Sequence, residues 1–211
     1  MEEALETLSR DPRFAPLIAR YGKPVLARGK TPFQALTRAI IFQQLSGKAA
    51  SSIYSRFVAL YGITVRTPID WETHAARRFP TPREVLTISD DTLRGAGLSM
   101  QKIRYIKDLA QKFDDGTIPH HRLHNMTNDE IIDILTDVHG IGVWTVQMFL
   151  IFTLHRLDVL PVDDLGIRKG FRSLYDMKSL PSKRTMERLA RPWRQHASIA
   201  SWYLWRVSDD A

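Results

Sequence analysis

The stretch Leu135-Thr136-Asp137-Val138-His139-Gly140-Ile141-Gly142-Val143-Trp144-Thr145 lies between two segments whose apolar residues recur at helical spacing. The segment before it opens on a capping box, Thr127-Asn128-Asp129-Glu130. The segment after it, about residues 143–154, is apolar almost all round, so we expect it to be buried. The pattern predicts two helices joined by a tight hairpin at about residues 135–146.

The glycines of this hairpin indicate a phosphate-binding turn. Gly140 and Gly142 flank Ile141, which we expect to plug the apolar groove between the two helices. Free N–H groups at the start of the second helix, aided by its dipole, bind phosphate without regard to base sequence. Thr145 in the first turn supports this interpretation. The alternative is a turn that only needs glycine.

Composition narrows the class of protein. The 211 residues are 44% hydrophobic and 25% charged, an ordinary globular balance. The chain has no cysteine, which excludes disulfides, thiolate zinc sites, Cys-ligated iron–sulfur clusters and a Cys nucleophile. The longest apolar stretch, about residues 144–154, is near half of the ~20 residues of a membrane span. No basic-then-apolar leader opens the chain, so we expect neither secretion nor membrane insertion.

The charge favours a polyanionic partner. The net charge is +7 and the pI about 9.8. Residues 165–206 hold 10 Lys and Arg against 2 Asp and Glu, a local +8, so the remainder carries −1. A basic segment of this kind is a candidate for nucleic-acid binding, and the alternative is a solvated basic surface.

Helix-start signals recur along the chain and predict an all-α fold. Candidate N-caps are Thr31, Thr81, Thr127, Ser89, Ser99 and Ser182. We predict nine or ten helices, including one or two short ones within the first thirty residues, in a single domain over residues 1–211. Residues 63–65 give the only hint of strand alternation.

Two adjacent carboxylates, Asp163 and Asp164, follow Pro161 and precede a helical segment over residues 165–174. Aspartate is favoured at a helix N-cap, so one of the two is expected to cap this helix. Capping does not require two carboxylates. Neighbouring residues at a helix entry point in different directions, so the pair need not share a role.

The hairpin, the buried helix and the Pro-x-Asp-Asp motif together resemble the helix–hairpin–helix DNA glycosylases, specifically the AlkA-type 3-methyladenine DNA glycosylase II group. Three further segments agree with the resemblance, which covers roughly residues 33–205. They are Phe33-Gln34-Ala35-Leu36 through Gln43-Gln44-Leu45-Ser46, Gly97-Leu98-Ser99 with Lys102 and Tyr105, and Arg191-Pro192-Trp193-Arg194 with Trp202-Tyr203.

The resemblance implies a two-lobed, nearly all-α fold with the active-site cleft between the lobes and no iron–sulfur cluster. It implies hydrolysis of the N-glycosidic bond of an alkylated purine that is flipped out of duplex DNA. Asp164 then stabilises the oxocarbenium-like sugar and orients the attacking water, and Asp163 is a helix cap or supporting residue. An alternative alignment, to endonuclease III relatives, chooses Asp163.

The same resemblance assigns the base pocket and the wedge. Trp144 stands where bifunctional glycosylase/lyases carry the Lys of Gly-x-Lys-Thr, so a monofunctional enzyme without lyase activity is expected. Trp144, Met148, Trp202 and Tyr203 are candidate pocket residues, with core packing as the alternative for each Trp. Leu45 matches the intercalating Leu, with Gln44 beside it. The alternative is that Leu45 ends its helix in the core. Trp193 and Trp205 are assigned to the core.

No cofactor is expected to be required. The resemblance implies a possible structural Na⁺ or K⁺ at the hairpin, held by the carbonyls of Thr136, Val138 and Ile141. A zinc site at His120, His121 and His124 is less favoured than an exposed loop.

We expect a monomer that acts on double-stranded DNA containing alkylated bases, in the cytoplasm or nucleoid of a bacterium or the nucleus of a eukaryote. Two alternatives remain: a non-catalytic, damage-sensing DNA-binding relative, and a glycosylase for another lesion such as etheno-adenine. Asp164 favours an enzyme, whereas Met148, where the group often has Tyr, favours an altered activity.

Overall fold

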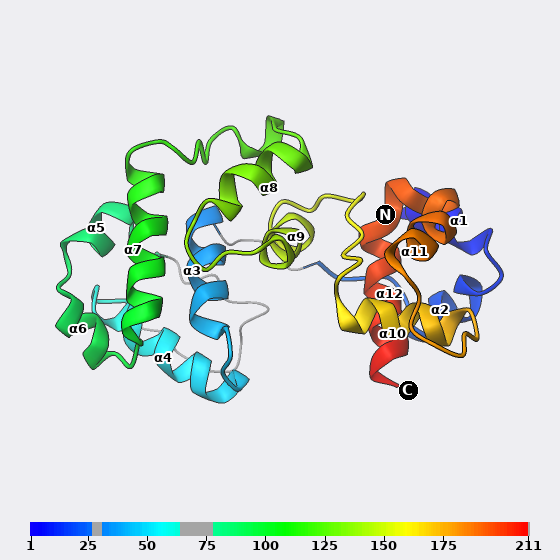
Figure 1. The fold of residues 1–211 in the computed structure, drawn as a ribbon, viewed down its shortest axis with the longest axis horizontal. Coiled ribbons are helices and arrows are strands. Elements are labelled where there is room, and N and C mark those ends of the chain that lie inside the picture. The colour runs from blue at the N-terminus through cyan, green and yellow to red at the C-terminus, as the bar shows by residue number, and fades with distance from the viewer. Residues whose placement is uncertain (27–30, 64–77, 211) are drawn as a thin grey trace. The chain divides into compact units, whose positions relative to one another are not determined.

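A computed structural model describes residues 1–26, 31–63 and 78–210. Those residues form twelve α-helices and two 3₁₀ helices and contain no strand (Figure 1), which confirms the all-α prediction. The predicted nine or ten helices were too few, and the start of Gly47–Ala59 (α4), which Ser46 caps, was not predicted; Pro82–Thr87 (α5) and Asp90–Gly95 (α6) are separate helices of six residues each, as their predicted caps indicate. The strand hint at residues 63–65 falls mostly outside the described residues. No helix in the described part is long and apolar enough to cross a membrane.

The predicted N-caps are confirmed. Thr81 and Thr127 form complete capping boxes with Glu84 and Glu130. The side chains of Thr31, Ser89, Ser99 and Ser182 each accept a hydrogen bond from the backbone N–H three residues later. These local signals therefore set where seven helices begin, counting the cap at Asp164 described below.

The chain divides into two compact units. The central unit, Ala27–Phe149, contains α3 (Pro32–Phe42), α4 (Gly47–Ala59), α5, α6, α7 (Met100–Asp114), η1 (Leu123–Asn125), α8 (Asn128–Thr136) and most of α9 (Val143–Phe152). Helix α7 packs against α3, α5 and α6. Its buried face consists of the predicted residues Ile103, Ile106, Leu109, Ala110 and Phe113.

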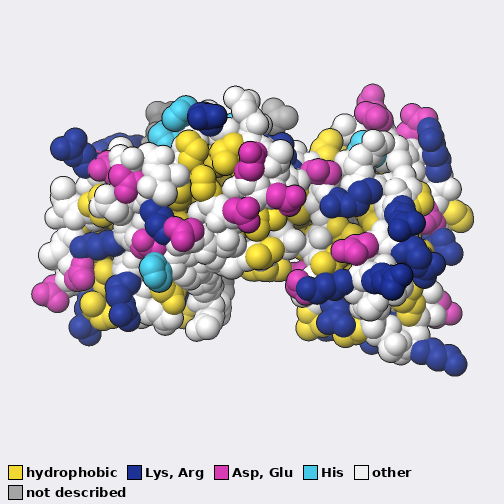
Figure 2. All heavy atoms as spheres, turned by 45° about the horizontal axis from the view of Figure 1, so that its top comes forward, with side chains coloured by type: hydrophobic (Ala, Val, Ile, Leu, Met, Phe, Trp, Pro, Cys, Tyr) yellow, Lys and Arg dark blue, Asp and Glu magenta, His cyan; other side chains and the backbone are white. Residues whose placement is uncertain are grey.

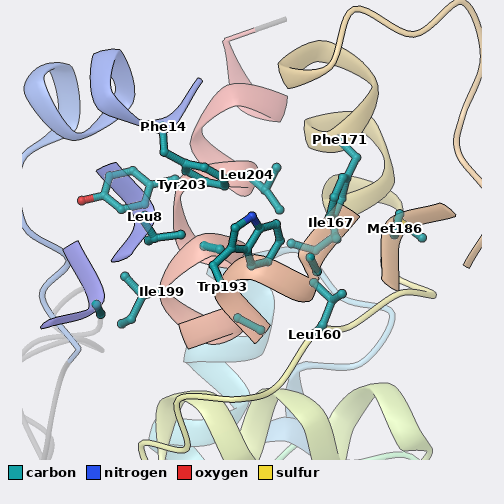
Figure 3. Close-up of a cluster of buried hydrophobic side chains, with 14 residues drawn as sticks. Leu8, Phe14, Leu160, Ile167, Phe171, Met186, Trp193, Ile199, Tyr203 and Leu204 are labelled. Atoms are coloured by element: carbon teal, nitrogen blue, oxygen red, sulfur yellow. The ribbon is translucent and has the colours of Figure 1, made fainter. Parts of the chain in front are cut away.

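The terminal unit combines Met1–Leu26 with Leu150–Ala211. It contains α1 (Glu2–Ser9), α2 (Phe14–Tyr21), α10 (Leu165–Leu174), α11 (Lys183–Ala190), η2 (Arg191–His196) and α12 (Ala197–Asp209). Helices α10 and α12 approach closely at Gly170, where a Cβ would overlap the backbone of Leu204. The core surrounds Trp193, which is 1% exposed and meets Phe14 edge-on at 5.5 Å (Figure 3), as predicted for this Trp.

Lys and Arg side chains cover much of the face of the terminal unit that Figure 2 presents. The ten Lys and Arg of the basic segment over residues 165–206 lie on α10, α11, η2 and α12 and in the connection between α10 and α11, and all of them except the half-buried Arg168 are exposed.

Candidate functional site

The hairpin connects α8 to α9 around two buried apolar residues. Val138 is 1% and Ile141 4% exposed, and the Ile141 N–H donates to the Val138 carbonyl at 3.1 Å. Ile141 therefore packs inward as predicted. Gly140 has a φ of +80°, and a Cβ there would overlap the ring of Tyr105 on α7. Glycine is required at this position for both reasons.

The hairpin presents backbone N–H groups. The N–H groups of His139 and Ile141 are used internally, by Asp108 and Val138. No acceptor for the N–H of Gly140 or Gly142 occurs among the described residues. Both glycines are exposed. The arrangement therefore offers donors where an anion can approach the start of a helix.

Helix α9 is exposed at its first two residues and at its last, Phe152, which is 40% exposed, and is buried or half-buried between them. The carbonyl of Gly142 accepts from the N–H of Val146, and the next two residues, Val143 and Trp144, are 47% and 50% exposed. The prediction that this helix is buried throughout is therefore wrong for its first turn. Thr145, the third expected phosphate contact, is only 8% exposed, so little of its surface is accessible to an anion.

The turn between α3 and α4 displays the candidate wedge. Gln44 has a φ of +57°, which turns the chain sharply before Leu45. Leu45 is 39% exposed and Gln44 is exposed beside it. The alternative that Leu45 closes α3 within the core is not what the structure shows. An exposed Leu at a turn has the shape that insertion between bases requires.

Asp164 is the N-cap of α10. Its Oδ1 accepts one hydrogen bond from the N–H of Ile167 at 2.8 Å and another from Nε1 of Trp205 at 2.9 Å. The carboxylate is half-buried and fixed from two directions. Asp163 is exposed and pairs with Lys183 at 2.7 Å. Of the two roles expected for Asp163, helix cap or supporting residue, the first is thus wrong, because Asp164 caps α10.

The hydrogen bond from Trp205 to Asp164 was not predicted from the sequence. Trp205 was assigned to the core, yet it is only half-buried, stacks on Phe152 at 5.8 Å and holds Asp164. Its spacing of three residues from Trp202 on α12 is the one sequence signal that could have drawn attention to it. The contact itself spans 41 positions and depends on how α10 packs against α12.

The candidate pocket residues differ in accessibility. Trp144 is half-exposed, and Met148 lies one turn further along α9 and is half-buried. Trp202 is half-buried, with the guanidinium carbon of Arg206 4.8 Å from its ring centroid. Tyr203 is fully buried in the terminal core (Figure 3). Its hydroxyl donates to the carbonyl of Gly22 at 2.7 Å. Tyr203 is therefore a core residue and offers no surface to a base.

The candidate cation ligands surround a shallow depression lined by hairpin residues 136–142. The Val138 carbonyl accepts from Ile141, and the Lys112 ammonium binds the Asp137 carbonyl nearby.

No group of three His, Cys, Asp or Glu side chains within the described ranges could hold a metal ion. The histidines at 120, 121 and 124 are exposed and form no such group.

The candidate residues fall into two sets. The hairpin, Leu45, Trp144 and Met148 belong to the central unit. Asp164, Trp202 and Trp205 belong to the terminal unit.

A hairpin with free glycine amides, an exposed Leu at a neighbouring turn and a fixed carboxylate after the second helix define a helix–hairpin–helix repair protein. The model of the HhH-GPD superfamily of base excision DNA repair proteins matches residues 37–195. The chain belongs to this superfamily.

Within the superfamily, the chain is similar to several 3-methyladenine DNA glycosylases. The chain is 34% identical over 197 residues, 93% of its length and 81% of the relative's, to DNA-3-methyladenine glycosylase 1 of Schizosaccharomyces pombe. A solved structure of an S. pombe 3-methyladenine DNA glycosylase with abasic DNA matches with a TM-score of 0.77 and 34% identity, covering 97% and 95% of the two chains. A Bacillus halodurans DNA-3-methyladenine glycosidase matches with a TM-score of 0.82 and 33% identity, covering 96% and 87%.

Proposed function

We propose that this chain is a DNA glycosylase that hydrolyses the N-glycosidic bond of alkylated purines, of the 3-methyladenine and 7-methylguanine type, in duplex DNA. Membership of the superfamily and the names of its relatives support the reaction class. The observation that carries the proposal is the Asp164 carboxylate, held by Ile167 and Trp205 at the start of α10. Duplex DNA is the partner, bound through the hairpin amides.

The chemistry fits a single carboxylate. A purine inside the duplex is inaccessible, so the nucleotide must rotate out of the stack, and in this proposal the exposed Leu45 fills the gap. A base alkylated at N3 or N7 carries positive charge and leaves as a neutral molecule, so it needs little help from a general acid. Asp164 stabilises the developing oxocarbenium ion, orients the water that attacks C1′ and accepts the proton that this water loses as the new C–O bond forms. The products are the free base and an abasic site.

We further propose that the enzyme is monofunctional. A lyase needs an amine that forms a Schiff base with the sugar. The position after Gly142-Val143 holds Trp144, whose indole cannot form one. We expect that borohydride traps no covalent complex between the protein and damaged DNA. A strong trapped band would contradict this part of the proposal.

The decisive experiment compares two adjacent carboxylates. Asn at position 164 can still cap α10, so Asp164→Asn should fold and bind DNA. Its release of methylated bases from alkylated duplex should fall by about 100-fold or more, the loss typical of a removed electrostatic stabiliser. Asp163→Asn is the matched control, because Asp163 only forms an exposed pair with Lys183, and it should retain wild-type activity. The reverse result would assign catalysis to Asp163, and full activity in both would remove the carboxylate mechanism.

One observation favours a second substrate. The Arg206 guanidinium lies over one face of the Trp202 ring, so a base can stack only on the opposite face, where the nearby positive charge would repel a cationic base. A neutral lesion such as etheno-adenine avoids this repulsion. Duplexes carrying either lesion, compared under single-turnover conditions, separate the two candidates. No release of either base would support the non-catalytic alternative.

For the hairpin we propose a structural Na⁺ or K⁺ bound by the carbonyls of Thr136, Val138 and Ile141. Carbonyl oxygens suit a hard cation, and the Val138 oxygen retains a second lone pair beside its bond from Ile141. The chemistry does not require the ion. Thermal unfolding in KCl and in tetramethylammonium chloride at equal ionic strength tests the proposal, and equal midpoints would refute it.

A further inference from the structure

Four residues on one face of α7 contact the two loops that the proposed function assigns to DNA. Lys102, Tyr105, Asp108 and Lys112 follow each other at spacings of three, three and four, so they form one stripe. All four are half-buried, unlike the exposed Gln101, Arg104 and Gln111 of the same helix. Lys102 contacts the end of α3, and the other three contact the hairpin.

Lys102 fixes the chain immediately before the wedge. Its ammonium donates to the carbonyl of Ile41 at 2.7 Å and to that of Gln43 at 2.8 Å. The last carbonyls of a helix have no partner within it, and a positive charge there also complements the helix dipole. Burial lowers the pKa of Lys102. This contact therefore holds the end of α3 immediately before Gln44 and Leu45.

The next turns of α7 hold the hairpin. Oδ2 of Asp108 accepts from both the backbone N–H and the ring Nδ1 of His139 at 2.8 Å. Lys112 pairs with the Asp137 carboxylate at 2.7 Å. The Tyr105 ring fills the space that a side chain at Gly140 would need. Helix α7 thus contacts the hairpin at Asp137, His139 and Gly140, before and at the first glycine of the turn.

A direct hydrogen bond joins the two loops. Nε2 of Gln43 donates to the carbonyl of Gly140 at 2.9 Å, across 97 positions of sequence. Gly140 therefore accepts a hydrogen bond through its carbonyl, whereas its N–H has no acceptor among the described residues. The wedge turn and the phosphate-binding turn are therefore linked twice, through α7 and through Gln43.

We infer that Gln43 and Lys102 are positioning residues that set Leu45 at a fixed location relative to the hairpin amides. The inference rests on the proposed function, because it takes duplex DNA as the ligand of both loops. Because the two loops are held together, binding of the DNA backbone at the hairpin determines the base step into which Leu45 inserts. A loop free to move would lose this preorganisation and insert less often.

The test measures insertion of Leu45 without catalysis. The probe is a duplex with a tetrahydrofuran abasic analogue and 2-aminopurine next to it, whose fluorescence rises when the stack opens. Gln43→Ala should weaken the insertion equilibrium about threefold to tenfold, as expected for one lost hydrogen bond. Binding of an undamaged duplex should change by less than about twofold, because the hairpin amides remain. Gln111→Ala, an exposed substitution on α7, is the matched control.

A double-mutant cycle separates positioning from general destabilisation. If Gln43 acts by placing Leu45, Gln43→Ala should have no further effect on the fluorescence in a Leu45→Ala background. An equal effect in both backgrounds, or none in either, would overturn the inference. Lys102→Met should reproduce the loss of insertion, and Lys102→Arg, which keeps two donors, should restore part of it. Because the probe needs no excision, a wild-type protein that inserts without releasing methylated bases would refute only the proposed reaction.

Discussion

Trp205 donates its indole N–H to Oδ1 of Asp164 at 2.9 Å, which joins the last helix of the chain to the N-terminus of α10. The space around Gly166, next to this hydrogen bond, is crowded. A Cβ on Gly166 would lie 2.9 Å from Cδ1 of Trp205 and 3.1 Å from Oδ1 of Asp164. The orientation of the carboxylate therefore depends on a donor from α12 and on a missing side chain in α10.

Removing the donor should weaken catalysis while the ring contact survives. Trp205→Phe eliminates the indole N–H but retains an aromatic ring against Phe152. Loss of one hydrogen bond to a charged group is worth about 1.5–3 kcal/mol, so we expect single-turnover excision to slow by about tenfold or more. Tyr21→Phe, which removes a hydroxyl that binds Asp210 in the same unit and has no part in the proposed site, is the control and should keep the wild-type rate. An unchanged rate in Trp205→Phe would show that the hydrogen bond does not matter to the reaction.

Adding a methyl group at Gly166 should separate stability from activity. Ala within a helix is favoured over Gly by roughly 0.5–1 kcal/mol, which offsets part of the crowding against Trp205. Unfolding in urea should therefore change by less than about 1 kcal/mol, whereas excision should fall by about tenfold because the carboxylate is displaced. Gly95→Ala, where nothing lies within 4 Å of the new Cβ, is the control. Wild-type activity in Gly166→Ala would contradict the argument.

The two hairpin glycines should respond differently to alanine. Gly140→Ala places a Cβ in the Tyr105 ring at a φ of +80°, so we expect a destabilisation of about 1–3 kcal/mol and weaker DNA binding. At Gly142 nothing lies within 4 Å of a new Cβ, so Gly142→Ala should unfold like the wild type. Any loss of DNA affinity in Gly142→Ala then reports obstruction of the amide donors. Equal unfolding curves for both variants would show that the Tyr105 contact is unimportant.

Protonation of Asp108 in acid should weaken its contact with the hairpin and lower the free energy of unfolding. Burial raises the pKa of Asp108, but the hydrogen bonds from His139 and the charge of Lys112 outweigh it, and the net pKa lies below the ordinary 3.8. A depressed pKa contributes stability that is present above 3.8 and is lost as the pH falls through the folded-state value. Asp108→Asn should therefore be less stable than the wild type near neutral pH.

The difference between the two proteins should shrink as the solution becomes more acid than pH 3.8. Urea unfolding of both proteins over this range measures it. Asp114→Asn, an exposed substitution at the end of α7, controls for the loss of one negative charge. A constant difference across the range would contradict the assignment to Asp108.

The amino-acid sequence by itself determined the helical character, most helix starts and the family. Caps at Thr31, Thr81 and Thr127 and the buried spacing of α7 act over three to four residues, so they can be recognised before any tertiary contact is known. The hairpin was found for the same reason. The membership of the superfamily followed from the order of these motifs along the chain.

Only the tertiary structure decided which candidate residues are exposed and which residues distant in the sequence they contact. Tyr203 and Trp205 are both aromatic residues of α12, yet one is enclosed by the terminal core and the other holds Asp164. The link from Gln43 to Gly140 crosses 97 positions. Such contacts depend on how helices pack, because neighbouring positions on a helix face different environments and their spacing does not say which element covers each face.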